Sequence, residues 1–351
     1  MTRRTLVLVA VIVLALVLVA GGLLACKKQD PEVVAAWPEA DTERTIAKPA
    51  EPPRWPLTGL EAPSAEETVQ RVVSVKIENS SESRPQTNLQ LADVVYESVT
   101  EGGITRFNAI FHSQAPENVG PVRSARLSDT YIVPQYHALF GFSGASPTVN
   151  AAVNAAGIEN LSEDAGISAP FTRSKKHSAP HNLFASVPAF RAEGERKGMP
   201  TTMEITGLTF DRSASAEATP TITQVTIPFS SYNTVTWNYD AGSKTYLRVN
   251  NGKNFMDAGT GEQLHATNVV VLWAQHKTAS SDVVGSTTYE IVLTGSGRAT
   301  VFRNGQRYDC TWEATADAPP VFKAADGTQV KLSPGNTWMQ VIRTDINITM
   351  Q

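Results

Sequence analysis

Apolar and polar residues are arranged in four different ways along the 351-residue chain. Behind two arginines, an unbroken apolar run fills residues 5–25, and residues 27–55 then combine proline and charge with little apolar periodicity. Short strand-like and helix-like runs follow one another from 56 to 209, whereas residues 210–351 show mostly period-two alternation. We therefore expect a leader over 1–26, an extended tether over 27–55, and two folded domains over 56–209 and 210–351.

The first folded stretch is predicted to be a mixed α/β domain. Its strands are expected at 72–79, 94–100, 105–114 and 138–144. Its helices are expected at 84–93, 121–136, 147–157 and 187–198, the last two closed by glycines. Short strands and helices that alternate in this way indicate a layered α/β or α+β arrangement.

The second folded stretch is predicted to be mainly β. Its strands are expected at 234–240, 244–250, 268–277, 287–295, 297–305, 306–314 and 336–344. Asn251-Gly252 and Asn304-Gly305 are strong signals for tight hairpin turns. A sandwich or curled sheet follows. We expect an α+β fold overall, with a mixed N-terminal domain and a smaller, mainly β C-terminal domain.

The composition is that of a folded globular protein, with 41% hydrophobic and 18% charged residues. The formal net charge is −4. Nucleic-acid binding requires a basic surface, so no nucleic-acid partner is expected. No metal or organic cofactor is indicated by the motifs.

The N-terminus has the marks of an export signal. Two arginines precede the apolar run, which ends in Leu-Leu-Ala-Cys, a sequence that resembles the bacterial lipobox with Cys26 as the lipidated residue. The alternative is an uncleaved signal anchor, because residues 5–25 are long enough to span a bilayer. Both interpretations place the folded part on the extracytoplasmic face of the plasma membrane.

Cleavage before Cys26 would remove two of the 30 basic residues and no acidic ones, which leaves a net charge of −6. Lipid, rather than surface charge, would then hold the protein at the membrane. Cys310 is the only other cysteine, so a lipidated Cys26 leaves it without a disulfide partner. Because Cys310 lies in an alternating run, we expect a half-buried core thiol.

Glu97 lies between two valines on one face of a predicted strand. A carboxylate on an apolar face needs a partner, because an unpaired buried charge is costly. The sequence offers arginines as partners and also places Asp93 and Glu101 nearby. The candidate partners are Arg84, Arg106, Arg123 and Arg126.

Arg123 and Arg126 lie three residues apart at the start of the predicted helix 121–136. Two cations at a helix N-terminus require something anionic. One interpretation is a structural lock in which they meet Glu97 or Glu101. The other is a ligand site in which the arginines and the helix start hold an anion. The sequence leaves both open.

Residues 173–184 are predicted to form a basic loop. His177 and His181 have helical metal-ligand spacing, but Pro180 between them argues against a helix, and no acidic third ligand is near. We expect either contact with an anionic polymer or a solvated charged loop.

No established enzyme motif is present. Two arrangements remain as hypotheses. Ser143 or Ser146 could act as a nucleophile with His181 as base, and Glu97 with Glu101 could serve in glycoside hydrolysis.

Several long motifs are similar to those of the YerB-like lipoprotein family of bacteria. They include "LQLADVVYE", "EGGITRF", "GPVRSAR", "SAPHNLF", "GSGRATVFRNGQ" and "LSPGNTW". The resemblance implies a lipoprotein signal and two domains, the second smaller and β-rich, with no assigned biochemical function. The residues that mark the family fall here on Arg84, Asp93, Glu97, Glu101, Arg106, Arg123, Arg126, His181 and Asn182.

We therefore expect a membrane-anchored extracytoplasmic lipoprotein that binds an anionic or glycan ligand of the cell envelope, either a polymer or a protein. The ligand-binding candidates are Arg84, Arg106, Arg123, Arg126, His181 and Asn182. Asp93, Glu97 and Glu101 are catalytic or ion-pair candidates. The alternatives are a hydrolase or transferase that acts on an envelope polymer, and a structural scaffold lipoprotein.

Overall fold

A computed structural model of the chain describes residues 51–213, 221–281 and 287–351. Residues 51–351 form one unit. The predicted leader, Cys26 and the tether up to residue 50 lie outside the described residues. At the end of the predicted tether, Trp55 is already buried and its ring lies 5.0 Å from that of His112.

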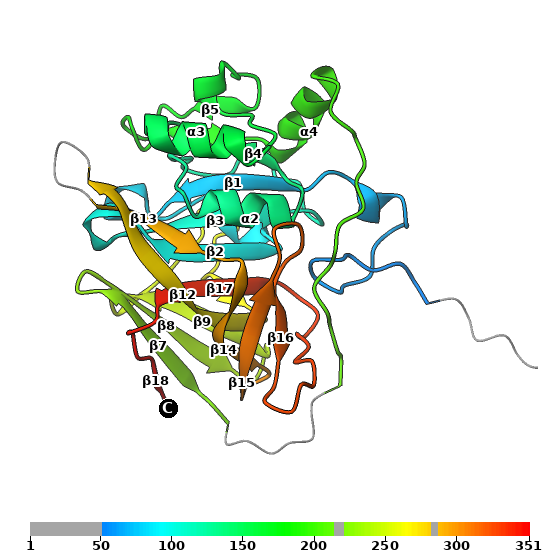
Figure 1. The fold of residues 1–351 in the computed structure, drawn as a ribbon, viewed down its shortest axis with the longest axis vertical. Helices are drawn as coiled ribbons and strands as arrows, with labels where there is room; N and C mark the ends of the chain where they lie inside the picture. Colours follow the sequence, from blue (N-terminus) through cyan, green and yellow to red (C-terminus); the bar gives the residue numbers. More distant parts are fainter. Residues whose placement is uncertain (1–50, 214–220, 282–286) are drawn as a thin grey trace, which may run out of the picture. The chain divides into compact units, whose positions relative to one another are not determined.

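Among the described residues, ten strands form one mixed sheet, which we call the large sheet (Figure 1). Its order is β16-β15-β14-β12-β17-β2-β3-β1-β4, and β13 pairs with β12. The strands from the first predicted domain are β1 (Val73–Glu78), β2 (Val94–Val99), β3 (Thr105–Phe111) and β4 (Leu139–Gly141). Those from the second are β12 (Asn268–Ser281), β13 (Thr287–Val292), β14 (Gly295–Arg303), β15 (Gln306–Ala314), β16 (Val321–Lys323) and β17 (Thr337–Arg343).

The two predicted domains meet inside the large sheet. Strand β17 runs parallel to β2, with Thr337 opposite Val94, and is flanked on its other side by β12. Strands β2 and β17 and residues 268–274 of β12 are almost fully buried. The two halves therefore share one sheet and one core.

A second sheet of six strands, the small sheet, packs against one face of the large sheet. Its order is β10-β9-β8-β7-β18, with β11 paired to β9. The strands are β7 (Gln224–Ser230), β8 (Asn233–Asp240), β9 (Thr245–Asn250), β10 (Lys253–Asn254), β11 (His265–Ala266) and β18 (Thr349–Met350). Every second residue of β7 and β9 is buried, which is typical of half-buried strands; β9 was predicted and β7 was not. Trp237 and Trp338 meet between the sheets, with ring centroids 5.2 Å apart.

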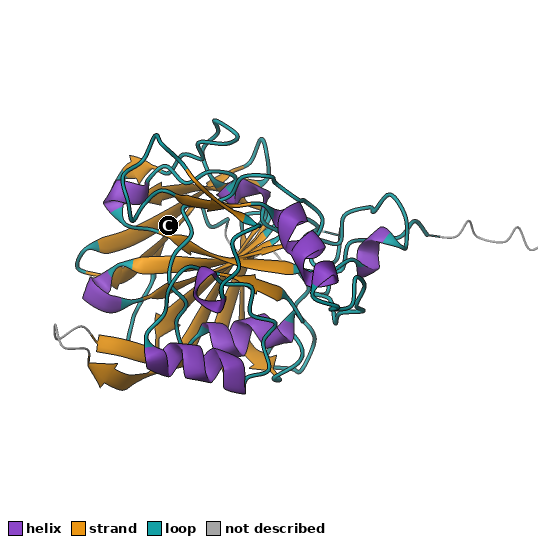
Figure 2. Cartoon of the chain, turned by 90° about the horizontal axis from the view of Figure 1, so that it is seen from above, coloured by secondary structure: helices purple, strands orange, loops and turns teal. Residues whose placement is uncertain are grey.

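The helices lie around the outside of the strands (Figure 2). They are α2 (Asp129–Gln135), α3 (Pro147–Ala155) and α4 (Val187–Arg196). Short 3₁₀ helices occur at Glu67–Val69, Ser81–Ser83, Leu89–Leu91, Glu101–Gly103 and Glu163–Ala165, and a two-stranded sheet joins β5 (Phe171–Arg173) to β6 (Leu183–Ala185). Helix α2 covers the face of the large sheet opposite the small sheet, where the hydroxyls of Tyr96 and Tyr136 lie 3.0 Å apart. None of the helices in the described ranges is long and apolar enough to cross a membrane.

Most predicted strands are confirmed, and so are the helices at 147–157 and 187–198. Both Asn-Gly hairpin turns are present, with positive φ at each residue. Strands predominate over helices in the described residues, so the expected α+β class fits only in part.

The helix predicted at 84–93 is wrong. Only Leu89–Leu91 form a short 3₁₀ turn. The backbone N–H groups of Asn88 and Gln90 donate to the carboxylate of Asp257, at 2.9 and 3.0 Å, instead of to helical carbonyls. A partner distant in sequence therefore overrides the local pattern.

The helix predicted at 121–136 is wrong over its first half. Residues 121–126 are not helical, and 121–123 run beside β1, where Glu78 N donates to Pro121 O and Arg123 N donates to Lys76 O, both at 2.9 Å. Helix α2 begins only at Asp129. Arg123 and Arg126 therefore do not lie at a helix N-terminus, and the expected anion site made by a helix start does not form.

The shared sheet predicts that the first half cannot fold alone. A fragment of residues 54–209 would lack β17, so the edge of β2 would be exposed. It would also lack the small sheet, so the face of the large sheet that the small sheet covers would be exposed. We expect no cooperative thermal transition by circular dichroism for this fragment, whereas the full chain in detergent melts cooperatively. A sharp melt of the fragment would instead show that 54–209 is an independent folding domain.

Candidate functional site

Glu97 lies between the two sheets and pairs with Arg248 of β9. The two side chains are fully buried, and their two N–O distances are 2.8 and 2.9 Å. The hydroxyl of Thr105 also donates to Glu97, at 2.8 Å. This two-pronged geometry is the strong form of an ion pair.

The guanidinium group of Arg248 also lies among four aromatic rings. Its central carbon is 4.8–5.5 Å from the ring centroids of Phe107, Trp237, Phe255 and Trp338. Aromatic faces attract cations, most strongly where water is excluded. The pair and its rings thus hold the small sheet against the large one.

The expected pairing of Glu97 with an arginine of its own domain is wrong. Alternation along β2 points Glu97 toward the small sheet, whereas Arg106, opposite Ser98 in register, points to the other face. Arg248 was missed by the sequence reasoning. A signal for it exists, because Arg248 occupies an inward position of β9 between Tyr246 and Asn250.

Several other charged candidates lie on the face of the large sheet opposite the small sheet. We call this group the arginine cluster. Glu78 of β1 lies opposite Arg106 of β3 in register. The segment 121–126, whose first three residues run beside β1, brings two further arginines to the same place. The members are Glu78, Glu101, Arg106, Arg123, Arg126 and His181.

Two carboxylates of the arginine cluster are paired. Glu78 contacts Arg123 Nε at 3.1 Å and His181 Nδ1 at 2.9 Å. Glu101 accepts from Arg126 Nε at 2.9 Å and from a terminal nitrogen at 2.6 Å, which is one of the pairings expected from the sequence. Burial raises the pKa of Glu101, but the hydrogen bonds and charge of Arg126 lower it more, so it lies below its ordinary value. Glu101 is therefore held as an anion.

Arg106 is different, because it has no carboxylate within ion-pair distance among the described residues. Its side chain donates one hydrogen bond, to the carbonyl of Ser124 at 3.3 Å, and its Nε has no partner. Burial, and then the charge of Arg126, lower the pKa of Arg106 to about 9. The cluster thus contains a buried cation whose charge is not neutralised by contact.

Asp93 and Asn182 have other surroundings. Asp93 accepts from the backbone N–H groups of His112 and Ser113, at 2.5 and 2.9 Å, and so closes the turn after β3. Burial raises the pKa of Asp93 to about 6, against the opposing effect of these hydrogen bonds. Asn182 accepts from Arg173 at 3.1 Å, in the basic loop next to His181.

The nucleophile hypotheses find little geometric support. Ser143 donates to Glu163 at 2.6 Å, and Ser146 caps helix α3. Cys310 is buried, as expected, and burial raises the pKa of its thiol to about 12, which disfavours the reactive thiolate. His177 lies against Phe184, and no group of three potential metal-ligating side chains occurs in the described residues.

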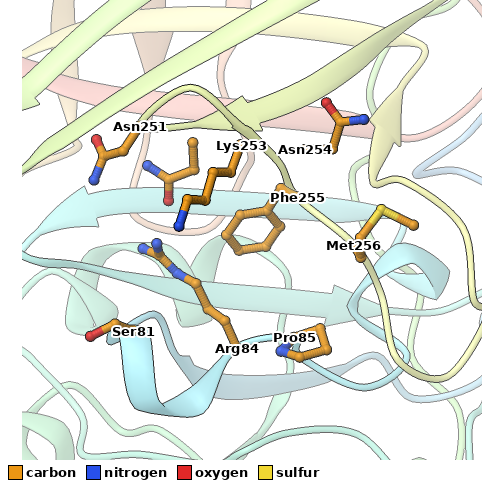
Figure 3. Close-up of a pocket in the computed structure, with 9 residues that line it drawn as sticks. Ser81, Arg84, Pro85, Asn251, Lys253, Asn254, Phe255 and Met256 are labelled. Atoms are coloured by element: carbon orange, nitrogen blue, oxygen red, sulfur yellow. The ribbon is translucent and has the colours of Figure 1, made fainter.

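A pocket of about 470 Å³ opens between the segment 81–85 and the β9–β10 hairpin, and we call it the Arg84 pocket (Figure 3). Its lining residues are Ser81, Arg84, Pro85, Asn250, Asn251, Lys253, Asn254, Phe255 and Met256. Arg84 lies 5.3 Å above the ring of Phe255. Burial, and then the charge of Arg248, lower the pKa of Arg84 to about 10.

Hydrogen bonds connect the Arg84 pocket to the buried ion pair. Arg84 donates to the side chain and the carbonyl of Asn79, both at 2.9 Å. Asn79 in turn donates to Thr105 at 2.7 Å, and Thr105 donates to Glu97. Of the sequence-predicted candidates, Arg84 therefore lies at the pocket, whereas Arg106, Arg123, Arg126 and His181 gather in the arginine cluster.

The sequence matches both domain models of one family. Residues 57–200 match "Protein of unknown function (DUF3048) N-terminal domain", and residues 225–339 match the corresponding C-terminal domain. The chain therefore belongs to the DUF3048 family, which confirms the resemblance drawn from the motifs.

Two comparisons with individual proteins agree. The chain is 29% identical to "Putative lipoprotein YerB" of Bacillus subtilis (strain 168) over 290 residues, which cover 82% of this chain and 85% of that protein. It is also similar to the crystal structure of the YerB protein from Bacillus subtilis, with a TM-score of 0.75 and 29% identity over 85% of this chain and 99% of that chain. Neither description names a ligand or a reaction.

The Glu97–Arg248 pair leads to a stability prediction. Glu97→Gln and Arg248→Met should each lower the free energy of unfolding by about 3–5 kcal/mol, because each leaves a buried charge without its partner. The double variant should lose much less than the sum of the two single losses. Urea unfolding of the four proteins measures this coupling.

The matched control is Arg343→Met, which removes a pair with Asp345 whose side chains are 48% and 69% exposed. We expect a loss of less than about 1 kcal/mol there. Strictly additive losses for Glu97 and Arg248 would show that their contact does not stabilise the fold.

Proposed function

We propose that this protein is a lipoprotein, anchored through Cys26 on the extracytoplasmic face of the plasma membrane, whose arginine cluster binds an anionic ligand of the cell envelope. The basic, apolar and Leu-Leu-Ala-Cys parts of residues 1–26 support the anchor. The name of the relative from Bacillus subtilis, which calls that protein a lipoprotein, supports it independently.

The observation that carries the binding proposal is the state of Arg106. Its side chain is 7% exposed and has no carboxylate in contact among the described residues, while Arg123 and Arg126 add positive charge beside it. A buried charge without a partner is costly unless something compensates for it. An anion bound beside Arg106 would do so, and it would gain the fork-shaped donor geometry of guanidinium groups.

The neighbouring side chains can be reached from solvent. The side chains of Arg123, Arg126 and His181 are 25%, 16% and 22% exposed. Each already has one carboxylate partner, which fixes its position and leaves further donors for a ligand. A polymer that carries repeated phosphate or carboxylate groups could meet this surface and the basic loop around Arg173 together. Such binding would weaken with rising salt.

Arg106→Met separates the binding proposal from a structural lock. If Arg106 serves a ligand, its removal relieves an unpaired buried charge, so the melting temperature should stay the same or rise. The same variant should lose stabilisation by inorganic polyphosphate at low salt, which for the unaltered chain would reach about 2.7 kcal/mol at a hundredfold excess over Kd. Thermal melts of the full chain in detergent, with and without polyphosphate, measure both effects.

Arg307→Met is the control for charge loss at an exposed arginine outside the proposed surface, since Arg307 of β15 is 39% exposed and pairs with Asp309. It should leave both the melting temperature and most of the polyphosphate effect unchanged. A large drop in melting temperature for Arg106→Met, with no effect of polyphosphate on the unaltered chain, would favour the scaffold alternative.

One observation favours a second candidate function, a hydrolase or transferase that acts on an envelope polymer. Glu78 contacts His181 through Nδ1 and thereby orients the ring, which leaves Nε2 as a possible general base beside the arginines. Release of small fragments from purified envelope material would then stop in His181→Ala. It would continue in His177→Ala, the matched control, and equal rates in both variants would remove His181 from any reaction.

A further inference from the structure

The Arg84 pocket contains a buried hydrogen-bond acceptor without a donor. Asn250 lines the pocket and is 3% exposed, and its Oδ1 has no partner. The orientation of its amide is fixed, because Nδ2 donates to Asn233 Oδ1 at 2.7 Å and to the carbonyl of Thr234 at 3.1 Å. An unsatisfied buried carbonyl calls for a hydroxyl or N–H group from whatever fills the pocket.

The same pocket contains two cations that face each other. Figure 3 shows the ammonium group of Lys253 directed toward the guanidinium group of Arg84. Arg84 directs Nε and one terminal nitrogen to Asn79, and Lys253 forms no ion pair with any described residue. Like charges in one pocket repel each other, and the two carboxylates whose charge acts on Arg84, Glu97 and Glu82, lie outside the pocket lining.

The remaining walls are apolar or carry amides. Phe255, Pro85 and Met256 present apolar surface, and Met256 is a large hydrophobic side chain that is 41% exposed. Asn251, Asn254 and Ser81 add groups that can both donate and accept hydrogen bonds. A volume of about 470 Å³ is in the range of small-molecule sites.

We propose that the Arg84 pocket binds an acidic sugar unit, such as a uronic acid or a sugar phosphate at the end or along the chain of a glycan. The acid group lies with Arg84 and Lys253, a sugar hydroxyl donates to Asn250 Oδ1, and the apolar face of the ring packs on Phe255. This site is separate from the arginine cluster and does not depend on it.

Simpler ligands satisfy only part of the pocket. Inorganic phosphate would meet the cations, and a P–OH group could donate to Asn250 Oδ1, but phosphate has no apolar face to cover Phe255 and Met256. A neutral sugar would meet the acceptor and the apolar wall and would leave the two cations unmatched. An acidic peptide could bring a carboxylate and N–H donors, and it is the competing class in the test.

The test compares binding of glucuronic acid, glucose, inorganic phosphate and a short acidic peptide to the full chain in detergent, by saturation-transfer NMR and titration at millimolar concentrations. We expect glucuronic acid to bind at least about tenfold more tightly than the other three, as the loss of one charge-assisted hydrogen bond implies. Lys253→Glu and Arg84→Gln should each weaken it by about tenfold or more, with circular dichroism confirming that the variants fold.

Lys331→Glu, at an exposed lysine away from the pocket, is the matched control and should leave the affinity within about twofold. Arg123→Gln in the arginine cluster should also leave it unchanged. The proposal is overturned by equal binding of phosphate and glucuronic acid, by tighter binding of the acidic peptide, by no binding of any sugar acid, or by unchanged affinity in both pocket variants.

Discussion

The buried ion pair between Glu97 and Arg248 is the constraint on which the rest of this fold depends. Removing two charges from water is expensive, and the cost is offset only by close, well-aligned contact between the charges and by further hydrogen bonds. Thr105 and Asn79 meet the carboxylate, and four aromatic rings surround the guanidinium group. These partners come from both sheets, so satisfying one pair fixes the position of the small sheet on the large one.

The same requirement shapes the Arg84 pocket. Asn79 lies between Glu97 and Arg84, and Asn233 connects Thr105 to Asn250 on the far side of the pocket. Both polar walls are therefore held by bonds that lead back to the buried pair. A pocket whose donors and acceptors are already in place loses little freedom when it binds, which favours affinity for a small ligand.

The alternation of polar and apolar residues predicted most of the strands. Contacts between residues far apart in the sequence were not predicted. The period-two pattern located most strands, and it showed that Glu97 faces the core and needs a partner. It did not identify Arg248, because that partner is 151 residues away and belongs to the other half of the chain. The segments 84–93 and 121–126 have helix-like spacing, yet Asp257 accepts from the backbone N–H groups of Asn88 and Gln90, and residues 121–123 bond to the backbone of β1. The Arg84 pocket could not be foreseen, since its two walls are brought together only by the packing of the sheets.

Alternation along neighbouring strands also explains why one group of charges is buried as an ion pair and another forms the arginine cluster. Glu97 lies opposite Phe107, and Ser98 lies opposite Arg106, so adjacent positions direct a carboxylate to one face and a guanidinium group to the other. On the face toward the small sheet, Glu97 and Arg248 form a two-pronged pair that is closed to solvent, although Arg248 Nε has no hydrogen-bond partner. On the face opposite the small sheet, the charges that act on Arg106 are those of two arginines, Arg123 and Arg126, and of two carboxylates, Glu78 and Glu101. Both carboxylates already contact other cations. Because each strand alternates, the protein holds a charge-balanced buried ion pair on one face of the large sheet and an under-neutralised cationic surface on the other, at adjacent positions along the strands. The under-neutralised surface is the one that has electrostatic capacity left for a ligand.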